Sequence, residues 1–159
     1  DRNLGRTVHR LVEARAQQDI GRIGGISPQE LRVPEYLKEG VIRDHNMPFT
    51  ETQDMETALG EVDVLYMTRV QKERFFNEED YVRLKDSYIL TADKLRSARK
   101  EMIVMHPLPR VNEIAAEVDS DPRAKYFEQA QNGVYVRMAL ILALLGLEKG
   151  ILDGGEPVC

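Results

Sequence analysis

Apolar and polar stretches alternate along the chain in a way that predicts helices and strands in turn. Val8, Leu11, Val12 and Ala16 recur at helical spacing, which predicts an amphipathic helix over roughly residues 6–17. Two β-branched and apolar runs are typical of buried strands. Local start and stop signals predict the further helices: one that starts at 27–30, one at 54–59, one that starts at 77, one from Thr91 to about 99 and one over about 134–147. The two buried strands lie at 62–67 and 102–105, and a short strand is predicted at 88–90.

One segment fits neither element well. Residues 20–26 stand where the alternation requires a strand, yet they include Gly21, Gly24 and Gly25. The spacing of these glycines does not match the G-x-G-x-x-G fingerprint, so it gives no support for a dinucleotide site. Glycine weakens a strand interior, and we therefore expect a weak strand or a loop here.

Short buried strands separated by helices predict an α/β layered fold with a mostly parallel sheet. Composition agrees, because 159 residues with 42% hydrophobic and 31% charged positions are typical of one globular domain. A net charge of −5 without a block of Lys or Arg argues against a nucleic-acid partner. The final apolar run is shorter than the roughly 20 residues of a membrane span. A single cysteine, Cys159, leaves no intrachain disulfide and no thiol metal site, which suits a reducing compartment.

Polar side chains follow both predicted buried strands, where ligands of open α/β sheets bind. Arg69 and Gln71 alternate around Val70, so on an extended segment they face the same side and together could clamp a carboxylate. The alternative is a surface salt bridge from Arg69 to Glu73 or Glu113, and spacing alone leaves it open.

The second strand is followed by His106-Pro107-Leu108-Pro109, here called the proline loop. Two prolines fix φ and remove backbone donors, so the loop should present carbonyl oxygens to a ligand with N–H groups, such as a carbamoyl group. The alternative is a rigid turn with His106 as a packing residue. Arg6 stands at a predicted helix N-terminus, which suits an anion or, alternatively, leaves a solvated arginine.

Longer strings carry more information than these spacings. Segments 66–74 and 105–114 resemble aspartate carbamoyltransferase catalytic chains, and shorter strings at 5–9, 121–124, 126–127 and 129–130 match in the same order. The resemblance covers nearly the whole chain. It implies transfer of a carbamoyl group from carbamoyl phosphate to L-aspartate in pyrimidine biosynthesis, by a cytoplasmic homotrimer of two-domain subunits without metal or organic cofactor.

By this resemblance the chain corresponds to the second, aspartate-binding domain. Residues 1–132 are expected to form the α/β domain, 133–150 a closing helix that contacts the missing N-terminal carbamoyl-phosphate domain, and 151–159 a tail. The expected partners are L-aspartate, carbamoyl phosphate and that missing domain. The isolated chain is accordingly predicted to be inactive.

The resemblance also assigns roles to individual residues. Arg6 and Arg69 would hold the two aspartate carboxylates with Gln71 beside Arg69, the Pro107 and Leu108 carbonyls would accept N–H bonds, Pro109 would stiffen the loop, and Glu73 and Glu113 would orient Arg69. Amine attack on a carbonyl carbon depends on proximity and charge stabilisation. No side chain of this half is therefore expected to act as a nucleophile.

The chain departs from the family pattern in several places, and two alternatives to the resemblance can be weighed. The family's Ser-Thr-Arg-Thr-Arg phosphate loop and its carbonyl-polarising histidine are missing, and His106 is not that histidine. Residues 1–4 and the glycine-rich segment 20–26 also differ from the usual pattern. The related ornithine enzyme carries a cysteine where this chain has Pro107, which disfavours it. A non-catalytic module that keeps the fold is disfavoured by the intact Arg6, Arg69 and Gln71.

Overall fold

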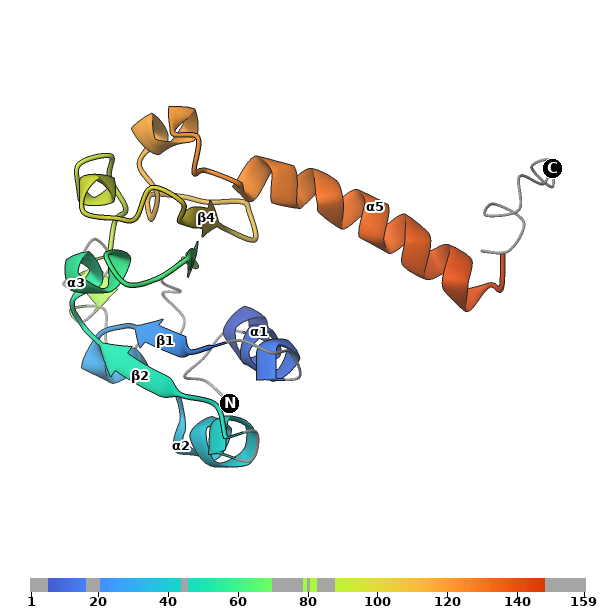
Figure 1. The fold of residues 1–159 in the computed structure, drawn as a ribbon, viewed down its shortest axis with the longest axis horizontal. Coiled ribbons are helices and arrows are strands. Elements are labelled where there is room, and N and C mark those ends of the chain that lie inside the picture. The colour runs from blue at the N-terminus through green and yellow to red at the C-terminus, as the bar shows by residue number, and fades with distance from the viewer. Residues whose placement is uncertain are drawn as a thin grey trace.

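The computed structural model describes residues 6–16, 21–43, 46–69, 79, 81–82 and 88–147. Helices and strands alternate along most of this length (Figure 1). The α-helices are α1 (Arg6–Ala16), α2 (Glu35–Leu37), α3 (Met55–Leu59) and α5 (Tyr126–Leu144), and α2 continues into a π-helix, η2 (Lys38–Arg43). The strands are β1 (Ile23–Ile26), β2 (Phe49–Thr52), β3 (Val64–Tyr66) and β4 (Ile103–Met105). Short 3-10 helices lie at Gln29–Leu31, Lys94–Arg96 and Ala116–Ser120.

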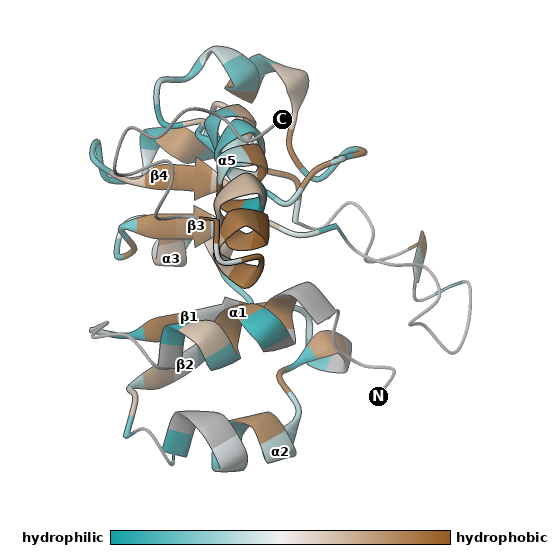
Figure 2. Cartoon of the chain, turned by 90° about the vertical axis from the view of Figure 1, so that its right-hand side faces the viewer, coloured by the Kyte–Doolittle hydropathy of each residue, from teal (hydrophilic) through white to brown (hydrophobic). Residues whose placement is uncertain are grey.

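The strands form two parallel pairs. β1 pairs with β2 from Ile23 opposite Phe49, and β3 pairs with β4 from Val64 opposite Ile103. A parallel bridge from Val104 of β4 to Ala124 extends the second pair, and a separate parallel bridge joins Leu90 to Ile114. Figure 2 shows α1 lying over the β1–β2 pair and α5 starting beside the β3–β4 pair. The expected α/β architecture with parallel strands is confirmed, and β2 is a strand that the sequence patterns did not reveal.

Two apolar clusters hold these layers together. The larger one surrounds β3 and β4 and contains Met55, Leu59, Leu65, Met67, Leu90, Leu95, Met102, Val104, Ile114, Val118 and Tyr126. The smaller one joins α1 to β1 and β2 and contains Val12, Val33, Leu37 and Met47. Ile26, at the end of β1, packs against the larger cluster. Full burial of each such side chain contributes roughly 1.5–3 kcal/mol, so the β3–β4 region is the more strongly stabilised part.

Several sequence predictions are confirmed. α1 and α3 occupy the predicted ranges, and the Asp54 side chain accepts a hydrogen bond from the Thr57 backbone N–H at 3.2 Å as an N-cap. The glycine-rich segment is a short strand, β1. A Cβ added at Gly24 or Gly25 would meet its nearest neighbours at 3.5–3.6 Å, an ordinary contact distance. Packing in this strand therefore does not require glycine.

Three predicted elements are shorter than expected. The helix start at Ser27 produces only the 3-10 turn Gln29–Leu31, capped by no side chain. The Thr91 Oγ1 accepts the Lys94 N–H at 3.3 Å, but the residue at the N-cap of the following 3-10 turn is Asp93, and this turn already ends at Arg96. The strand expected at 88–90 is reduced to the bridge at Leu90. The helix expected from residue 77 lies mostly outside the described residues.

The last helix differs most from expectation. It was predicted to begin near Val134, after Gly133, yet α5 begins at Tyr126 and passes through Gly133 without a break. A helical glycine costs only about 1 kcal/mol relative to alanine, and tertiary anchoring of the first turn outweighs this cost. Tyr126 is fully buried, and Gln129 is bonded to the strand ends described below.

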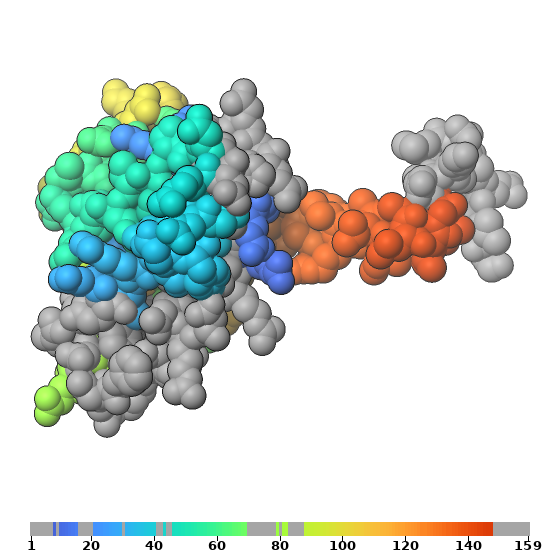
Figure 3. Space-filling view, turned by 90° about the horizontal axis from the view of Figure 1, so that it is seen from below, coloured from blue at the N-terminus to red at the C-terminus, as the bar shows by residue number. Residues whose placement is uncertain are grey.

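Beyond its first turn, α5 extends away from the rest of the molecule (Figures 1 and 3). Its large apolar side chains are mostly exposed there: Val134, Tyr135, Val136, Met138, Leu140, Ile141 and Leu144, with Leu145 and Leu147 just after it. None of the helices in the described ranges combines the length and apolarity that crossing a membrane requires.

Candidate functional site

The two predicted site segments leave the β3–β4 pair at the same edge. Tyr66 is opposite Met105 in the parallel register, and the Met67 N–H donates to the Met105 carbonyl at 2.8 Å. Arg69 follows β3 with an exposed side chain, and His106 directly follows β4. The structure therefore brings Arg69 and the proline loop to one edge of the sheet, as the strand order predicted.

The proline loop has an unusual backbone. The Leu108–Pro109 peptide is cis, and Leu108 has a φ of 46°. This left-handed conformation costs a residue with a Cβ roughly 1–2 kcal/mol. The Leu108 side chain packs against the larger apolar cluster, whereas Pro107 and Pro109 are exposed. Interactions around the loop must therefore impose its shape, because leucine on its own disfavours the left-handed conformation.

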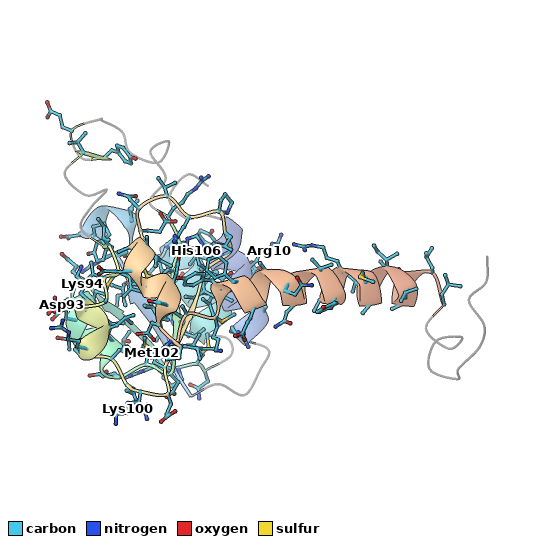
Figure 4. All side chains as sticks on the ribbon, turned by 90° about the horizontal axis from the view of Figure 1, so that it is seen from above. Arg10, Asp93, Lys94, Lys100, Met102 and His106 are labelled. Atoms are coloured by element: carbon cyan, nitrogen blue, oxygen red, sulfur yellow. The ribbon has the colours of Figure 1, made fainter. Side chains whose placement is uncertain are left out.

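His106 supplies one such interaction. Its ring is buried at the junction of α5 with the body of the molecule (Figure 4), with Nδ1 2.9 Å from the Leu108 N and Nε2 2.7 Å from Glu113 Oε1. Since Nδ1 accepts the Leu108 N–H, the ring proton must be on Nε2, which donates to Glu113. Burial lowers the pKa of His106 below its usual value, although the hydrogen bond and charge of Glu113 oppose this shift. A neutral imidazole fits both contacts.

Glu113 completes the arrangement around the proline loop. Its carboxylate is buried, and Oε2 accepts the backbone N–H groups of Val111 at 3.0 Å and Asn112 at 3.1 Å. Both carboxylate oxygens thus bind groups of the segment 106–113. The role expected from the resemblance, orientation of Arg69 by Glu113, stays a prediction, since the described side-chain bonds of Glu113 are with this segment instead.

Gln129, in the first turn of α5, connects the two strand ends. Its Oε1 accepts the His106 backbone N–H at 3.0 Å, and its Nε2 donates to the Tyr66 hydroxyl at 3.2 Å. The sequence reasoning gave Gln129 no role in the site. Its place in the short string 129–130, which matches the family, is the one signal in the sequence, and that string indicates no specific contact.

A second polar cluster fixes the segment after the proline loop. Arg110 is paired with Asp119 through both terminal nitrogens, and the Tyr126 hydroxyl donates to Asp119. The Arg110 guanidinium lies 5.5 Å from the Tyr126 ring centroid, a cation–π contact. These bonds, with that from Arg110 first, lower the pKa of Asp119 to about 2, while burial and Asp119 raise the pKa of Tyr126 to about 12. Arg110 is thus held by the protein's own carboxylate.

Several predicted site residues lie outside the described part. Gln71 and Glu73 belong to the undescribed segment after Arg69. α1 begins at Arg6, which confirms its place at a helix N-terminus, but its side chain is not described. Of the predicted set, the structure therefore gathers Arg69, Pro107–Pro109 and Glu113. Among the described side chains, no group of three or more His, Cys, Asp or Glu residues could hold a metal ion.

The chain is similar to known proteins over most of its length. A family model described as "Aspartate/ornithine carbamoyltransferase, Asp/Orn binding domain" matches residues 1–144. The aspartate carbamoyltransferase catalytic subunit of Clostridium acetobutylicum is 58% identical over 147 residues, which cover 92% of this chain and 48% of the relative. The subunit of the same name from Clostridium botulinum (strain Okra) is 56% identical with the same coverage.

Solved structures give the same correspondence. The catalytic subunit of M. jannaschii aspartate transcarbamoylase in an orthorhombic crystal form has a TM-score of 0.83 at 40% identity, covering 94% of this chain and 48% of that one. Aspartate transcarbamoylase from Trypanosoma cruzi in complex with carbamoyl phosphate and aspartate has a TM-score of 0.79 at 34% identity, covering 89% and 47%. The chain spans about half the length of the curated relatives that it matches.

Proposed function

The chain belongs to the aspartate/ornithine carbamoyltransferase family, where it matches the Asp/Orn-binding domain, and on this premise we propose that it supplies the aspartate-binding half of an aspartate carbamoyltransferase. The complete enzyme would transfer the carbamoyl group of carbamoyl phosphate to the amine of L-aspartate in pyrimidine biosynthesis. The observation that carries this proposal is the common edge at which Arg69 and the proline loop leave β3 and β4.

The groups at this edge suit both the carboxylate of aspartate and the N–H groups near the bond that forms. A guanidinium such as Arg69 binds a carboxylate in a fixed, forked geometry. In the reaction a C–N bond forms between the aspartate amine and the carbamoyl carbon, the C–O bond to phosphate breaks, and the proton that the amine loses can pass to the released phosphate. The Pro107 and Leu108 carbonyls would accept N–H bonds from the carbamoyl and aspartate nitrogens and hold the amine against the carbamoyl carbon, so that catalysis arises from positioning.

The charge of this edge favours aspartate over ornithine. Arg69 is exposed beside the loop and lies close enough to it to act on the pKa of His106, whereas Arg110 is already paired with Asp119. The Arg69 cation attracts a carboxylate of aspartate and repels the side-chain ammonium of ornithine. The similar catalytic subunits from Clostridium are also named as aspartate enzymes.

The exposed apolar length of α5 supports the second part of the proposal. A helix that is apolar on all faces is normally covered, and monomeric proteins rarely expose an apolar patch of this kind. We propose that α5 packs against a carbamoyl-phosphate-binding half, which supplies the phosphate site, and that the complete subunits form cytoplasmic homotrimers. The similar catalytic subunits are about twice as long as this chain, which agrees with a subunit made of two such halves.

A chimera tests the proposal directly. The chain would replace the matching 147-residue segment of the Clostridium acetobutylicum subunit, and carbamoyl-aspartate formation would be measured with aspartate or ornithine as acceptor. We expect turnover with aspartate and about a hundredfold or greater loss with Arg69→Ala. The Glu56→Gln variant, an exposed change on α3, serves as the control for mutation itself. A folded chimera that binds carbamoyl phosphate but does not carbamoylate aspartate contradicts the proposal.

A further inference from the structure

The segment 106–113 is folded around a buried His–Glu pair that the proposed chemistry does not use. His106 and Glu113 are 2% and 5% exposed, and their side chains together accept or donate four hydrogen bonds within this segment when the bond between them is included. A buried polar pair of this kind is retained only where its bonds are satisfied. Among the described residues, no buried side-chain nitrogen or oxygen is left without a partner.

One of these bonds controls a backbone group of the proposed site. The N–H that His106 Nδ1 accepts belongs to Leu108, and it shares a peptide plane with the Pro107 carbonyl. The Pro107–Leu108 peptide is trans, since the cis peptide bond is the following one, between Leu108 and Pro109. In a planar trans peptide the N–H and the C=O point in opposite directions. A ring that holds the Leu108 N–H inward therefore directs the Pro107 carbonyl away from the buried pair.

We propose that His106 is a positioning residue: its ring, oriented by Glu113, aims the Pro107 carbonyl at the amine to be carbamoylated. The inference rests on the proposed function. His106 itself touches no substrate and transfers no proton to one. Glu113 acts one step further away, because by accepting the Nε2 proton it keeps Nδ1 free to accept from Leu108.

Protonation would remove this control. A proton on Nδ1 turns the acceptor into a donor, which cannot bond to the Leu108 N–H. Glu113, Arg110 and Arg69 are the charged groups that act on the ring, and burial has the largest effect, lowering the pKa of His106 below 6.5. The aspartate-competent form is therefore the neutral one. It should be lost as the pH falls through the lowered pKa of His106 in the folded enzyme.

Two amide substitutions separate the two ring nitrogens. In H106N the Oδ1 atom can take the place of Nδ1 and still accept the Leu108 N–H, while the bond to Glu113 is lost. In H106Q the Nε2 atom can take the place of the ring Nε2 and still donate to Glu113, while Leu108 loses its acceptor. Both variants are neutral at every pH of interest. They form a matched pair that differs in which bond survives.

In the active chimera described above, we expect kcat/KM for aspartate to fall about tenfold or more in H106Q and about threefold or less in H106N. The KM for carbamoyl phosphate should change little in either. The acidic decline of kcat/KM in the wild type should be absent from H106N. Equal losses in the two variants, in proportion to their unfolding free energies, would reduce His106 to a structural residue and overturn the inference.

A measurement on the histidine ring separates this inference from the proposed function. The ¹⁵N shifts of the His106 ring, assigned by comparison with H106N, should show a neutral ring protonated at Nε2 at pH 7.5. A ring protonated at Nδ1 excludes the inference whether or not the chimera is active. An inactive wild-type chimera with an Nε2-protonated ring would instead contradict the proposed function and leave the loop geometry intact.

Discussion

Replacing Leu140 and Leu144 with Gln should affect the isolated chain and the complete enzyme in different ways. The two leucines lie one turn apart on α5 and are 59% and 80% exposed. In the isolated chain they contact mainly water, so the double variant should change the unfolding free energy by no more than about 0.5 kcal/mol per site. Its main effect there should be weaker self-association and weaker binding of a dye that detects apolar surface.

The expected cost in the complete enzyme follows from these exposed fractions. Full burial of a leucine side chain contributes roughly 1.5–3 kcal/mol, so burial of the exposed fractions contributes roughly 1–2 kcal/mol for each residue. Losing both would weaken the association of the two halves by about 2–4 kcal/mol. This loss corresponds to a roughly 30- to 700-fold increase in the chain concentration that gives half-maximal activity.

The assay is complementation between separate chains. The first half of the Clostridium acetobutylicum subunit is titrated with this chain, and carbamoyl-aspartate formation gives the concentration for half-maximal activity. Val64→Thr, at a 49% exposed apolar position on β3, is the matched control and should leave that concentration unchanged. Sedimentation and dye binding are measured on the same samples. A wild-type chain that is a dye-free monomer, or a double variant with unchanged complementation, would refute the reasoning.

Three further outcomes are expected. Arg69→Ala should raise the KM for aspartate far more than that for carbamoyl phosphate, and Arg69→Lys should restore little because one ammonium cannot replace the fork; an unchanged aspartate KM removes the clamp. Pro107→Gly should lower kcat/KM more than Leu108→Ala, which should mainly lower stability in urea unfolding; the reverse order would mean that side-chain packing is what the loop supplies. Because the pKa of Asp119 is lowered to about 2, the stability that it contributes is present above its usual pKa near 3.8 and is lost as the pH falls toward 2. Asp119→Asn should flatten this decline in acid unfolding, and an unchanged slope would contradict it.

Much of the fold could be read from the sequence where side-chain pattern and burial agree. The runs that form β3 and β4 are apolar and β-branched, and a parallel order of these runs is enough to place Arg69 and the proline loop at one edge. β2 was missed because Phe49 is the one large apolar residue in Phe-Thr-Glu-Thr, and the backbone pairing with β1 is what makes it a strand. The sequence pattern places the start of α5 too late because Gly133 suggests a boundary, although the backbone makes no left-handed turn there.

The supporting contacts of the site could not be predicted in the same way. The bond between His106 and Glu113 spans a loop whose course depends on a left-handed leucine and a cis proline. No local pattern indicates either feature. The bonds of Gln129 to Tyr66 and to the His106 backbone connect residues far apart in the chain. Such contacts follow from tertiary packing, whereas the residue types at the strand ends follow from the sequence alone.

The two separate apolar clusters imply that the molecule does not open uniformly. Opening free energies vary within a protein, and segments with few buried contacts exchange their amide hydrogens first. α1, β1 and β2 share the smaller cluster, so their amides should exchange faster than those of β3, β4 and the first turn of α5. Arg6 lies at the start of α1, whereas Arg69 follows β3. An aspartate held by both arginines would link the less stable part to the more stable one, and the slowing of exchange should therefore be greatest around α1.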